Sequence, residues 1–478
     1  MLTLGHALQA LGGDRAAANS GGPLISGGCV DSRAVQPGML FVALAGAHLD
    51  GHDFVGEAFA KGATVALVQR AVNGPWPVLD LTRGPLPAAA ACPQPVCLQV
   101  PDTLLALQTI AAYWRGKCAV RVVGITGSVG KSSTKEATAT VLAQRFRTLK
   151  NTGNQNNEIG LPLTLLQLSS AHERAVLEMG FYVAGEITQL CNLAQPQVGV
   201  ITNVYAVHAE RAGSLADIAR GKRELLDALP AAPDGVAVLN ADEPLVMEMA
   251  AHTRARIVTY GMGEAAQLRA SALESYGLDG IGFQLEHAGQ HLPVRVPLIG
   301  RHSVYTALRA IAVGVAEGMP ATAAAAALAQ PQARDGLRLK PVPGLHGSLI
   351  LDDSYNASPE SAVAALDLLA ELDAVRHIAV LGDMRELGAY ERAGHDLVGR
   401  HAGARVQLLV TVGQRARWIA AAARAGGLAA GATHEFETVE AATEFLRMQL
   451  RTGDVALVKG SLAMHLDGMV RQLANKDE

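Results

Sequence analysis

The sequence predicts an α/β protein of three domains, the middle one built on a doubly wound parallel sheet. The chain has 478 residues, which is about the length of three domains. Apolar, strand-like runs alternate with helical stretches along most of it, as in parallel α/β folds. Stretches rich in Pro and Gly, at 73–99 and 330–344, interrupt this alternation. The predicted domains are therefore residues 1–100, 101–335 and 336–478.

The first hundred residues contain a small α/β unit. We expect strands at 39–44 and 64–68 and a helix at 55–61, from the spacing of their apolar residues. Residues 73–99 are dominated by Pro, Gly and Ala, so we expect a loop or linker there.

The middle region begins with a predicted helix at 102–115, a strand at 121–126 and a helix from Lys131 to about Gln144. It closes with a predicted hairpin and an alanine-rich helical pair at 303–330. The last region repeats the alternation of strands and helices as a second α/β sheet. The remaining predicted strands are 175–179, 198–203, 236–239, 256–260, 283–286, 292–298, 348–351, 377–381, 408–412 and 455–458.

Composition excludes several classes of protein. Hydrophobic residues make up 49% and charged residues 18%, so the chain can bury large cores. Forty basic and 44 acidic residues give a net charge of −4 without a basic block, which argues against binding to nucleic acid or a membrane surface. No apolar run approaches the roughly 20 residues of a membrane span, and the N-terminus lacks the features of a secretory signal. The five cysteines form no C-x-x-C pair, so we expect a cytoplasmic protein without a disulfide framework.

The segment GITGSVGKSS, residues 124–133, has the features of a phosphate-binding loop. A strand leads into a glycine-rich turn and then a helix, so that backbone N–H groups and the helix dipole face an anion. The strict G-x-x-x-x-G-K-[ST] spacing would need glycine where Ile125 stands, so this is a variant. The alternative is a turn that merely packs a helix on a sheet. The expected ATP-binding residues of the loop are Thr126, Gly127, Ser128, Val129, Gly130, Lys131, Ser132 and Ser133.

Glu178 ends one predicted strand and His208 follows another, at the sheet edge where the phosphate loop also lies. Both could serve as ligands of Mg²⁺, although a single histidine is more often structural. Asp353 also ends a strand but belongs to the last domain, where a nucleotide contact is the more natural role. Lys222 lies in a predicted helix beside charged residues, which favours a solvated helix face. No N-K-x-D guanine motif occurs, so a GTPase is not expected, whereas a kinase and an ATP-driven ligase both remain open.

These segments resemble the Mur ligases, ATP-dependent amide-bond-forming enzymes of peptidoglycan synthesis. The resemblance covers nearly the whole chain, and its C-terminal motifs are similar to the branch of the family that adds D-alanyl-D-alanine. The motifs are DSR (31–33), PGMLFVALAGAHLDGHDF (37–54), AFAKGATVALV (58–68), GITGSVGKSSTKE (124–136), NTGNQNNEIGLPLTLL (151–166), LEMG (177–180), TNVYAVH (202–208), GSLADIARGKREL (213–225), DDSYNASPES (352–361), VLGDMRELG (380–388) and LVKGS (457–461).

The resemblance implies a UDP-binding N-terminal domain, a central P-loop ATPase domain and a Rossmann-like C-terminal domain. It implies that ATP phosphorylates the terminal carboxylate of UDP-N-acetylmuramoyl-tripeptide and that D-alanyl-D-alanine attacks the acyl phosphate. It also implies two Mg²⁺ ions and a monomeric, cytoplasmic enzyme. The alternatives are the sibling ligase that adds a diamino acid, folylpolyglutamate synthase, and a nucleotide-binding switch or degenerate homologue.

The resemblance also assigns roles to individual residues. Lys131, Glu178, His208 and Lys222 would be catalytic, with Lys222 carbamylated by CO₂ and holding Mg²⁺ together with Ser132, Glu178 and His208. His302, Arg338 and Asp353 would contact ATP. The remaining candidates are substrate-binding residues, for which turn chemistry, a helix cap and a surface charge are the alternatives: Ser32, Arg33, Asn154, Asn156 and Asn157.

The sequence departs from the family pattern near the expected adenine site and in the last domain. After His302, Ser303 and Thr306 stand where the family has asparagines, so the contacts to adenine must differ. Leu462 replaces the arginine that usually follows the K-G-S motif.

Overall fold

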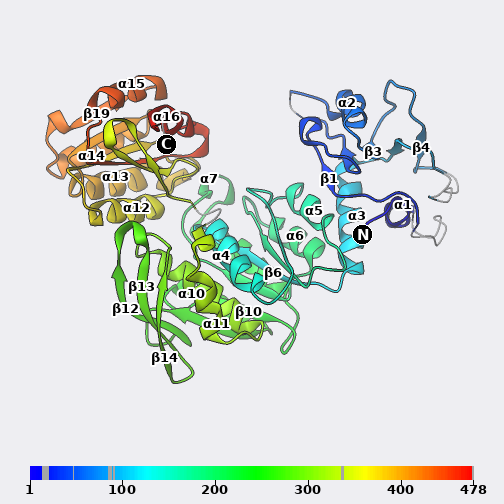
Figure 1. The fold of residues 1–478 in the computed structure, drawn as a ribbon, viewed down its shortest axis with the longest axis horizontal. Coiled ribbons are helices and arrows are strands. Elements are labelled where there is room, and N and C mark those ends of the chain that lie inside the picture. The colour runs from blue at the N-terminus through cyan, green and yellow to red at the C-terminus, as the bar shows by residue number, and fades with distance from the viewer. Residues whose placement is uncertain (13–20, 47, 84–88, 90–91, 335–337, 476–478) are drawn as a thin grey trace.

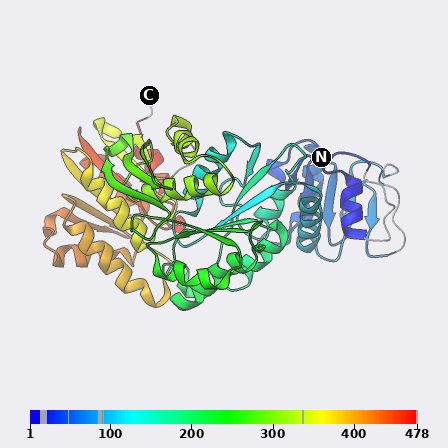
Figure 2. The ribbon, with the colours of Figure 1, turned by 90° about the horizontal axis from the view of Figure 1, so that it is seen from below.

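The computed structural model describes residues 1–12, 21–46, 48–83, 89, 92–334 and 338–475. It contains three sheets, and the largest lies between the other two (Figure 1). Seen from below, the N-terminal sheet lies at one end of an elongated molecule and the C-terminal sheet at the other (Figure 2). Within the described residues, no helix combines the length and apolar character needed to cross a membrane.

The N-terminal sheet is parallel and has the order β1-β2-β3-β5-β4. The prediction of a loop over 73–99 is wrong for its two ends, which form β4 and β5. Val96 pairs with Val65, and the apolar Val96, Cys97 and Leu98 are buried in this sheet. Of the predicted loop, residues 84–88 and 90–91 lie outside the described residues. The elements are α1 (Leu4–Gly12), β1 (Gly28–Cys29), β2 (Leu40–Val42), α2 (Val55–Ala60), β3 (Val65–Val68), β4 (Val78–Asp80) and β5 (Val96–Gln99).

The central sheet has the order β14-β13-β12-β11-β10-β9-β6-β8-β7, parallel except for the antiparallel β12–β13–β14 end. The predicted strands are present, and β7 and β12 are additional. The strands are β6 (Arg121–Thr126), β7 (Thr148–Lys150), β8 (Arg174–Glu178), β9 (Val198–Ile201), β10 (Val236–Asn240), β11 (Arg256–Gly261), β12 (Leu268–Ser275), β13 (Ile281–His287) and β14 (Gln290–Val296). The helices are α3 (Thr103–Lys117), α4 (Lys131–Ala143), α5 (Gly160–Leu165), α6 (Glu186–Ala194), α7 (Ala209–Ala212), α8 (Leu215–Asp227), α9 (Pro244–Glu248), α10 (Ser303–Ala316) and α11 (Ala321–Leu328).

Helices cover both faces of the central sheet, as predicted for a doubly wound fold. Because side chains alternate along a strand, Val122 of β6 packs into one core while Val123 and Ile125 pack into the other. The first core includes α3, α5, α6 and α8 and continues into the N-terminal sheet. The second core includes α4, α10 and α11. The central strands β6, β8, β9 and β10 are therefore buried almost throughout on both faces, so that polar groups gather at their ends.

The C-terminal sheet has the order β15-β16-β20-β17-β18-β19, parallel except for β15. Within the boundary predicted at 330–344, the final residues form β15, which pairs antiparallel with β16. The strand β19 was not predicted. The elements are β15 (Lys340–Pro343), β16 (Leu349–Asp353), α12 (Pro359–Glu371), β17 (Arg376–Gly382), α13 (Glu391–Gly403), β18 (Leu408–Val412), α14 (Ala416–Ala425), β19 (Thr433–Phe436), α15 (Val439–Gln449), β20 (Asp454–Lys459) and α16 (Asp467–Leu473).

Gly127 connects β6 to the loop that precedes α4, and its geometry admits no side chain. Its φ is +143°, and a Cβ there would lie 1.8 Å from Oγ1 of Thr202, at the end of the neighbouring β9. The second loop glycine, Gly130, has φ +83° and begins α4. The loop therefore lies directly against the carboxyl end of the sheet.

We predict that Gly127→Ala lowers the free energy of unfolding by about 1–3 kcal/mol, because the added methyl group forces a strained backbone away from Thr202. It should also weaken nucleotide binding. Thermal denaturation and nucleotide titration would measure both effects. Gly116→Ala is the matched control, since a Cβ at this helical position meets nothing within 4 Å. Equal stability and affinity in both variants would contradict the prediction.

Candidate functional site

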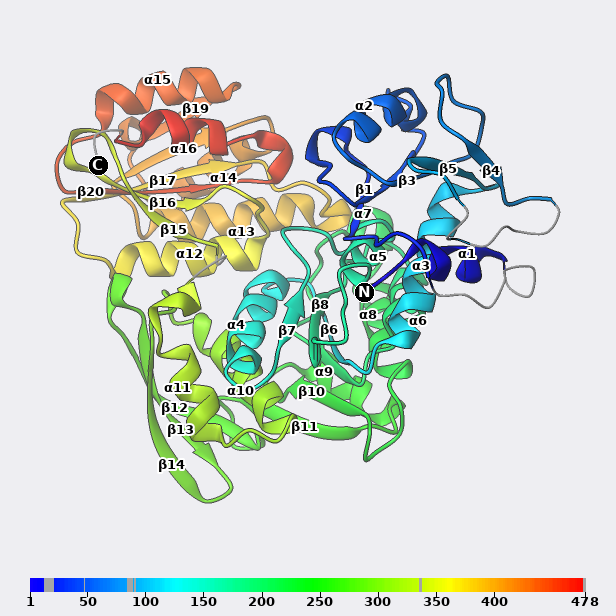
Figure 3. The same cartoon turned by 45° about the vertical axis from the view of Figure 1, so that its right-hand side comes forward.

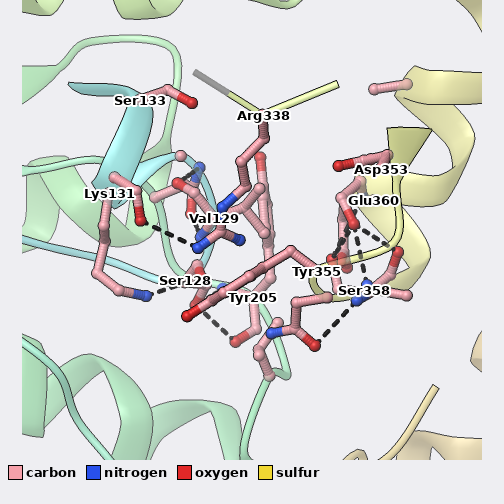
Figure 4. Close-up of a pocket in the computed structure, with 18 of the residues that line it drawn as sticks. Ser128, Val129, Lys131, Ser133, Tyr205, Arg338, Asp353, Tyr355, Ser358 and Glu360 are labelled. Carbon is pink, nitrogen blue, oxygen red and sulfur yellow. Dashed lines mark hydrogen bonds between the residues drawn. The ribbon is translucent and has the colours of Figure 1, made fainter. Parts of the chain in front are cut away.

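A cavity of about 950 Å³ lies where the central sheet faces the C-terminal domain. The phosphate loop, the ends of β8 and β9 and the start of α10 line it from the central side. Arg338 and the segment after β16 line it from the other side. In Figure 4 the loop residues Ser128 and Lys131 face Asp353 across the cavity, with Arg338 and Tyr355 between them.

The segment after β9 holds the phosphate loop in shape. The backbone N–H of Val129 donates to Oδ1 of Asn203 (2.8 Å), and Asn203 Nδ2 returns a bond to the Val129 carbonyl (3.1 Å). Ser128 Oγ donates to the Tyr205 carbonyl (2.9 Å). Lys131 Nζ donates to the carbonyl oxygens of Gly127 (2.9 Å) and Ser128 (3.2 Å), so its ammonium group lies against the loop.

Glu178 ends β8, and its side chain is only 2% exposed. Asn151 fixes its backbone through two hydrogen bonds (2.9 and 3.0 Å). Asn156 Nδ2 donates to Glu178 Oε1 (2.9 Å), whereas the buried Oε2 has no hydrogen-bond partner in the described structure. A buried carboxylate oxygen without a partner costs free energy, and it is the type of atom that ligates a divalent cation.

Lys222 is buried, at 1% exposure, so the expectation of a solvated helix face is wrong. Helix α8 begins with a capping box at Ser214 and turns its apolar face, with Ile218 and Leu225, toward the sheet. Lys222 lies on this same face, and its Nζ is 4.8 Å from the centre of the Phe181 ring. Nowhere in the described chain does the Lys222 ammonium group meet a carboxylate.

His208 immediately precedes α7 and has a left-handed backbone, with φ +64°. Its Nδ1 is hydrogen-bonded to Oε2 of Glu386, a residue of the C-terminal domain. Its ring packs against that of Tyr182 in a T-shaped arrangement, with 4.7 Å between the ring centroids. His208 is therefore held between the central and C-terminal domains rather than pointing freely into solvent.

Basic groups act on one another at the phosphate-loop end of the site. Burial lowers the pKa of Lys222 well below its usual range, and the charge of Lys131 lowers it further. Burial lowers the pKa of Lys131, Glu178 opposes this shift, and Arg338 adds to it. Burial and the charge of Lys131 likewise lower the pKa of His208, while Glu386 opposes them. Basic groups held together at a phosphate loop are suited to binding a polyanion, whose charge offsets their mutual repulsion.

The acidic and imidazole side chains at the site are too few to hold a magnesium ion by themselves, so other donors must complete the set. Across the described residues, no three of His, Cys, Asp and Glu come together as a metal-binding group. Glu178, with its unpaired Oε2, and His208 supply two such donors. Ser132 Oγ, which now accepts a hydrogen bond from Arg338 Nη2 (3.0 Å), is a third oxygen at the loop.

The C-terminal domain contributes charged groups to the opposite wall. Arg338 stacks on the Tyr355 ring, with its guanidinium carbon 4.1 Å from the centroid, and reaches Ser132. Asp353 forms a buried ion pair with Lys459, whose Nζ also donates to the Asn356 carbonyl (2.9 Å). The hydrogen bond from the charged Arg338 to Ser132 thus joins this wall to the phosphate loop.

Most of the predicted site residues meet at this cavity. Asn157 does not line it; instead its Oδ1 accepts hydrogen bonds from the N–H groups of Ile159 (3.3 Å) and Gly160 (2.9 Å) at the start of α5, as the turn alternative holds. Thr126, Gly127 and Lys222 lie behind its surface. The predicted residues that line the cavity are Ser128, Val129, Gly130, Lys131, Ser132, Ser133, Asn154, Asn156, Glu178, His208, His302, Arg338 and Asp353.

Ser32 and Arg33 belong to the N-terminal domain and do not line the large cavity. Ser32 is buried and donates to Glu57 Oε2 (3.0 Å). Arg33 is exposed and paired with Asp31, with 2.8 Å between Nη2 and Oδ2. These contacts match a local structural role and leave substrate binding by the two residues a prediction.

Several lining residues were not predicted from the sequence. The side-chain amide of Asn203 holds the phosphate loop in shape. Asn203 belongs to the quoted motif TNVYAVH but was not singled out as a site residue. Arg309 is buried and bonds to Tyr260 Oη (2.7 Å) and the Thr202 carbonyl (3.0 Å) behind the loop. Lys459 and Glu386 were part of quoted motifs, but no sequence spacing indicates their partners 100 or more residues away.

The departure after His302 has a clear structural counterpart. Ser303 lines the cavity, but its Oγ donates to the Ile299 carbonyl one turn earlier (2.7 Å), so its hydroxyl proton is already used within the chain. Tyr305 also lines the cavity and donates to Asp242 Oδ2 (3.0 Å). An aromatic ring with an acidic neighbour therefore occupies this part of the wall.

Comparison with known proteins gives matches along the chain. Family models match residues 25–115 (Mur ligase family, catalytic domain), 125–314 (Mur ligase middle domain) and 337–462 (Mur ligase, glutamate ligase domain). The chain is 36% identical over 447 residues to UDP-N-acetylmuramoyl-tripeptide–D-alanyl-D-alanine ligase of Escherichia coli, covering 93% of this chain and 92% of that protein. It is 34% identical to the Bacillus subtilis protein of the same name, covering 94% and 93%.

Solved structures agree with this assignment. A crystal structure of MurF from Acinetobacter baumannii aligns with a TM-score of 0.81 and 30% identity, covering 98% of both chains. MurF ligase from Thermotoga maritima, crystallised in complex with ADP, aligns with a TM-score of 0.75 and 25% identity, covering 93% of this chain and 96% of that one. By its sequence, its fold and its phosphate-loop site, the chain belongs to the Mur ligase family.

Proposed function

We propose that this protein is an ATP-dependent ligase that joins D-alanyl-D-alanine to UDP-N-acetylmuramoyl-tripeptide and releases ADP and phosphate. The observation that carries the proposal is the cavity in which the phosphate loop, with Lys131 and Arg338, faces the DDSYNASPES segment. The names of the full-length relatives support this substrate pair over that of the sibling diamino-acid ligase.

The chemistry explains why basic groups gather at the phosphate loop. A free carboxylate is a poor electrophile, so one of its oxygens attacks the γ-phosphorus of ATP and ADP leaves. The amine of the dipeptide then attacks the acyl carbon, a tetrahedral intermediate forms, and phosphate departs as the amide is made. Negative charge gathers at one centre throughout, and preorganised cations stabilise it. Lys131, Arg338 and the loop N–H groups would neutralise and orient the phosphates.

Magnesium would be held by Ser132, Glu178, His208 and Lys222 in its carbamylated form, with two ions expected. A bound Mg²⁺ ion supplies Lewis-acid stabilisation of the charge on the transferring phosphoryl group. The unpaired Oε2 of Glu178 supports its role as a ligand. Asn156, bonded to the other carboxylate oxygen, would fix the orientation of that ligand.

The carbamate gives Lys222 a reason to be buried beside Lys131. Carbon dioxide adds only to a neutral amine, and burial together with the charge of Lys131 keeps the pKa of Lys222 low. Addition of CO₂ to this neutral amine, with release of one proton, gives an anion, which then has Lys131 as an attractive neighbour. Arginine could not do this, because its guanidinium group stays protonated.

The remaining assignments complete the proposal. His302, Arg338 and Asp353 would contact ATP, Asn154 and Asn156 would face the peptide, and Ser32 and Arg33 would bind the UDP-sugar. Residues 1–100, 101–335 and 336–478 would act as the UDP-binding, ATP-binding and closing domains of a cytoplasmic monomer.

The direct test is release of ADP with UDP-N-acetylmuramoyl-tripeptide, measured with and without D-alanyl-D-alanine. We expect sustained turnover only with both substrates, because the acyl phosphate needs an amine acceptor. Lys131→Ala should reduce the rate at least 100-fold and leave binding of the UDP substrate nearly unchanged. A nucleotide switch would hydrolyse ATP slowly without an acceptor, and a degenerate homologue would not turn over; either result would reject the proposal.

Lys222→Ala should be inactive and should regain part of its activity with acetate or propionate, which restores a carboxylate. With ¹³C-bicarbonate, the native protein should show a carbamate NMR signal that the variant lacks. The signal should weaken as the pH falls, because protonation of Nζ removes the reactive amine. Arg223→Met is the control, since Arg223 pairs with Asp227 on the helix surface. Full activity of Lys222→Ala without added carboxylate would exclude the carbamate.

A further inference from the structure

The contact between His208 and Glu386 joins two domains at the edge of the proposed metal site. Glu386 follows β17 in the C-terminal domain and has a left-handed backbone, with φ +66°. Its Oε2 is bonded to Nδ1 of His208, and its carbonyl accepts a hydrogen bond from the N–H of Glu210 (3.3 Å). Arg211 Nη2 lies 4.0 Å from its Oε1. One residue of the C-terminal domain thus contacts the start of α7 through both its side chain and its backbone.

The surrounding backbone is shaped for this contact. Gly388 has φ +55°, and a Cβ there would lie 3.0 Å from the backbone nitrogen of Glu210. Only a glycine allows the turn after Glu386 to approach α7 so closely. Figures 1 and 3 show α7 beside the C-terminal domain. The docking is therefore a defined interface of closely approaching backbones.

The bond to Nδ1 determines which ring nitrogen of His208 is free. When Nδ1 carries the proton shared with Glu386, the lone pair of the ring is on Nε2. No described residue is hydrogen-bonded to Nε2, and His208 lines the same cavity as Lys131 and Glu178. A carboxylate behind an imidazole is the arrangement that orients a histidine ligand and raises its basicity.

We propose that Glu386 is a positioning residue that makes the metal-binding form of His208 depend on docking of the C-terminal domain. The inference rests on the proposed function, in which His208 is a magnesium ligand. Docking places the Glu386 carboxylate behind His208 and so fixes the tautomer and ring orientation of the histidine. The metal site is then complete only when the C-terminal wall of the cavity is also in place. Assembly of the active site and closure of the domains would then be one event.

The test measures Mn²⁺ binding to the full-length protein in the presence of ADP, by titration and by pulsed EPR. Glu386→Ala should weaken Mn²⁺ binding about 10- to 100-fold and reduce the ¹⁴N coupling of the bound imidazole. Glu386→Gln, which keeps an oxygen acceptor, should fall between this variant and the native protein. Glu371→Ala is the matched control: it removes an ion pair with Arg301 (2.6 Å) that also joins the central and C-terminal domains but lies away from His208.

Small-angle scattering would report the docking of the domains in each variant. We expect both alanine variants to loosen docking, with loss of the ¹⁴N coupling confined to Glu386→Ala. Two results would overturn the inference: unchanged Mn²⁺ affinity and ¹⁴N coupling in Glu386→Ala, or equal losses in the two alanine variants. Either result would leave the proposed function standing. Failure of the native protein to bind Mn²⁺ with ADP would instead contradict the proposed metal site, and this inference with it.

Discussion

Two lysine amines that are shielded from water and form no ion pair in the described structure are the constraint on which this site depends. Burial lowers the pKa of both, the charge of Lys131 lowers that of Lys222 further, and Glu178, which opposes the shift at Lys131, has one carboxylate oxygen left unpaired. Removing ions from water without pairing them costs several kcal/mol each. A fold keeps such an arrangement when something outside the chain supplies the missing partners, and phosphates, divalent cations and CO₂ are complementary to these groups.

The groups around the site come from two domains, so neither domain alone could form it. The phosphate loop and α8 belong to the central sheet, whereas Arg338 and the Asp353–Lys459 pair approach from the C-terminal side. An acyl phosphate is hydrolysed by water, so a cavity whose two walls belong to different domains can admit large substrates when open and exclude water when closed. The N-terminal sheet shares a continuous core with the central domain, which would give a UDP-linked substrate bound there a fixed point of attachment.

Sequence reasoning recovered the parts of the molecule that depend on local patterns. The strand, glycine turn and helix around Lys131 were located almost to the residue, because apolar runs and glycines mark them. The burial of Lys222 could also have been predicted, since Ile218, Lys222 and Leu225 have the i, i+4, i+7 spacing of one helix face. The charged residues beside Lys222 led instead to the prediction of a solvated face. The bond from His208 to Glu386 has no local signature: it exists only because two domains meet. The strands β4 and β5 were missed because proline and glycine between them dominated the composition.

Transfer of oxygen tests the central mechanism most directly. With ¹⁸O in the terminal carboxylate of UDP-N-acetylmuramoyl-tripeptide, the acyl-phosphate mechanism predicts that the released phosphate carries one ¹⁸O atom per amide bond formed. The isotope content of that phosphate can be read by mass spectrometry or ³¹P NMR. Phosphate free of ¹⁸O, during normal formation of the amide product, would contradict the mechanism.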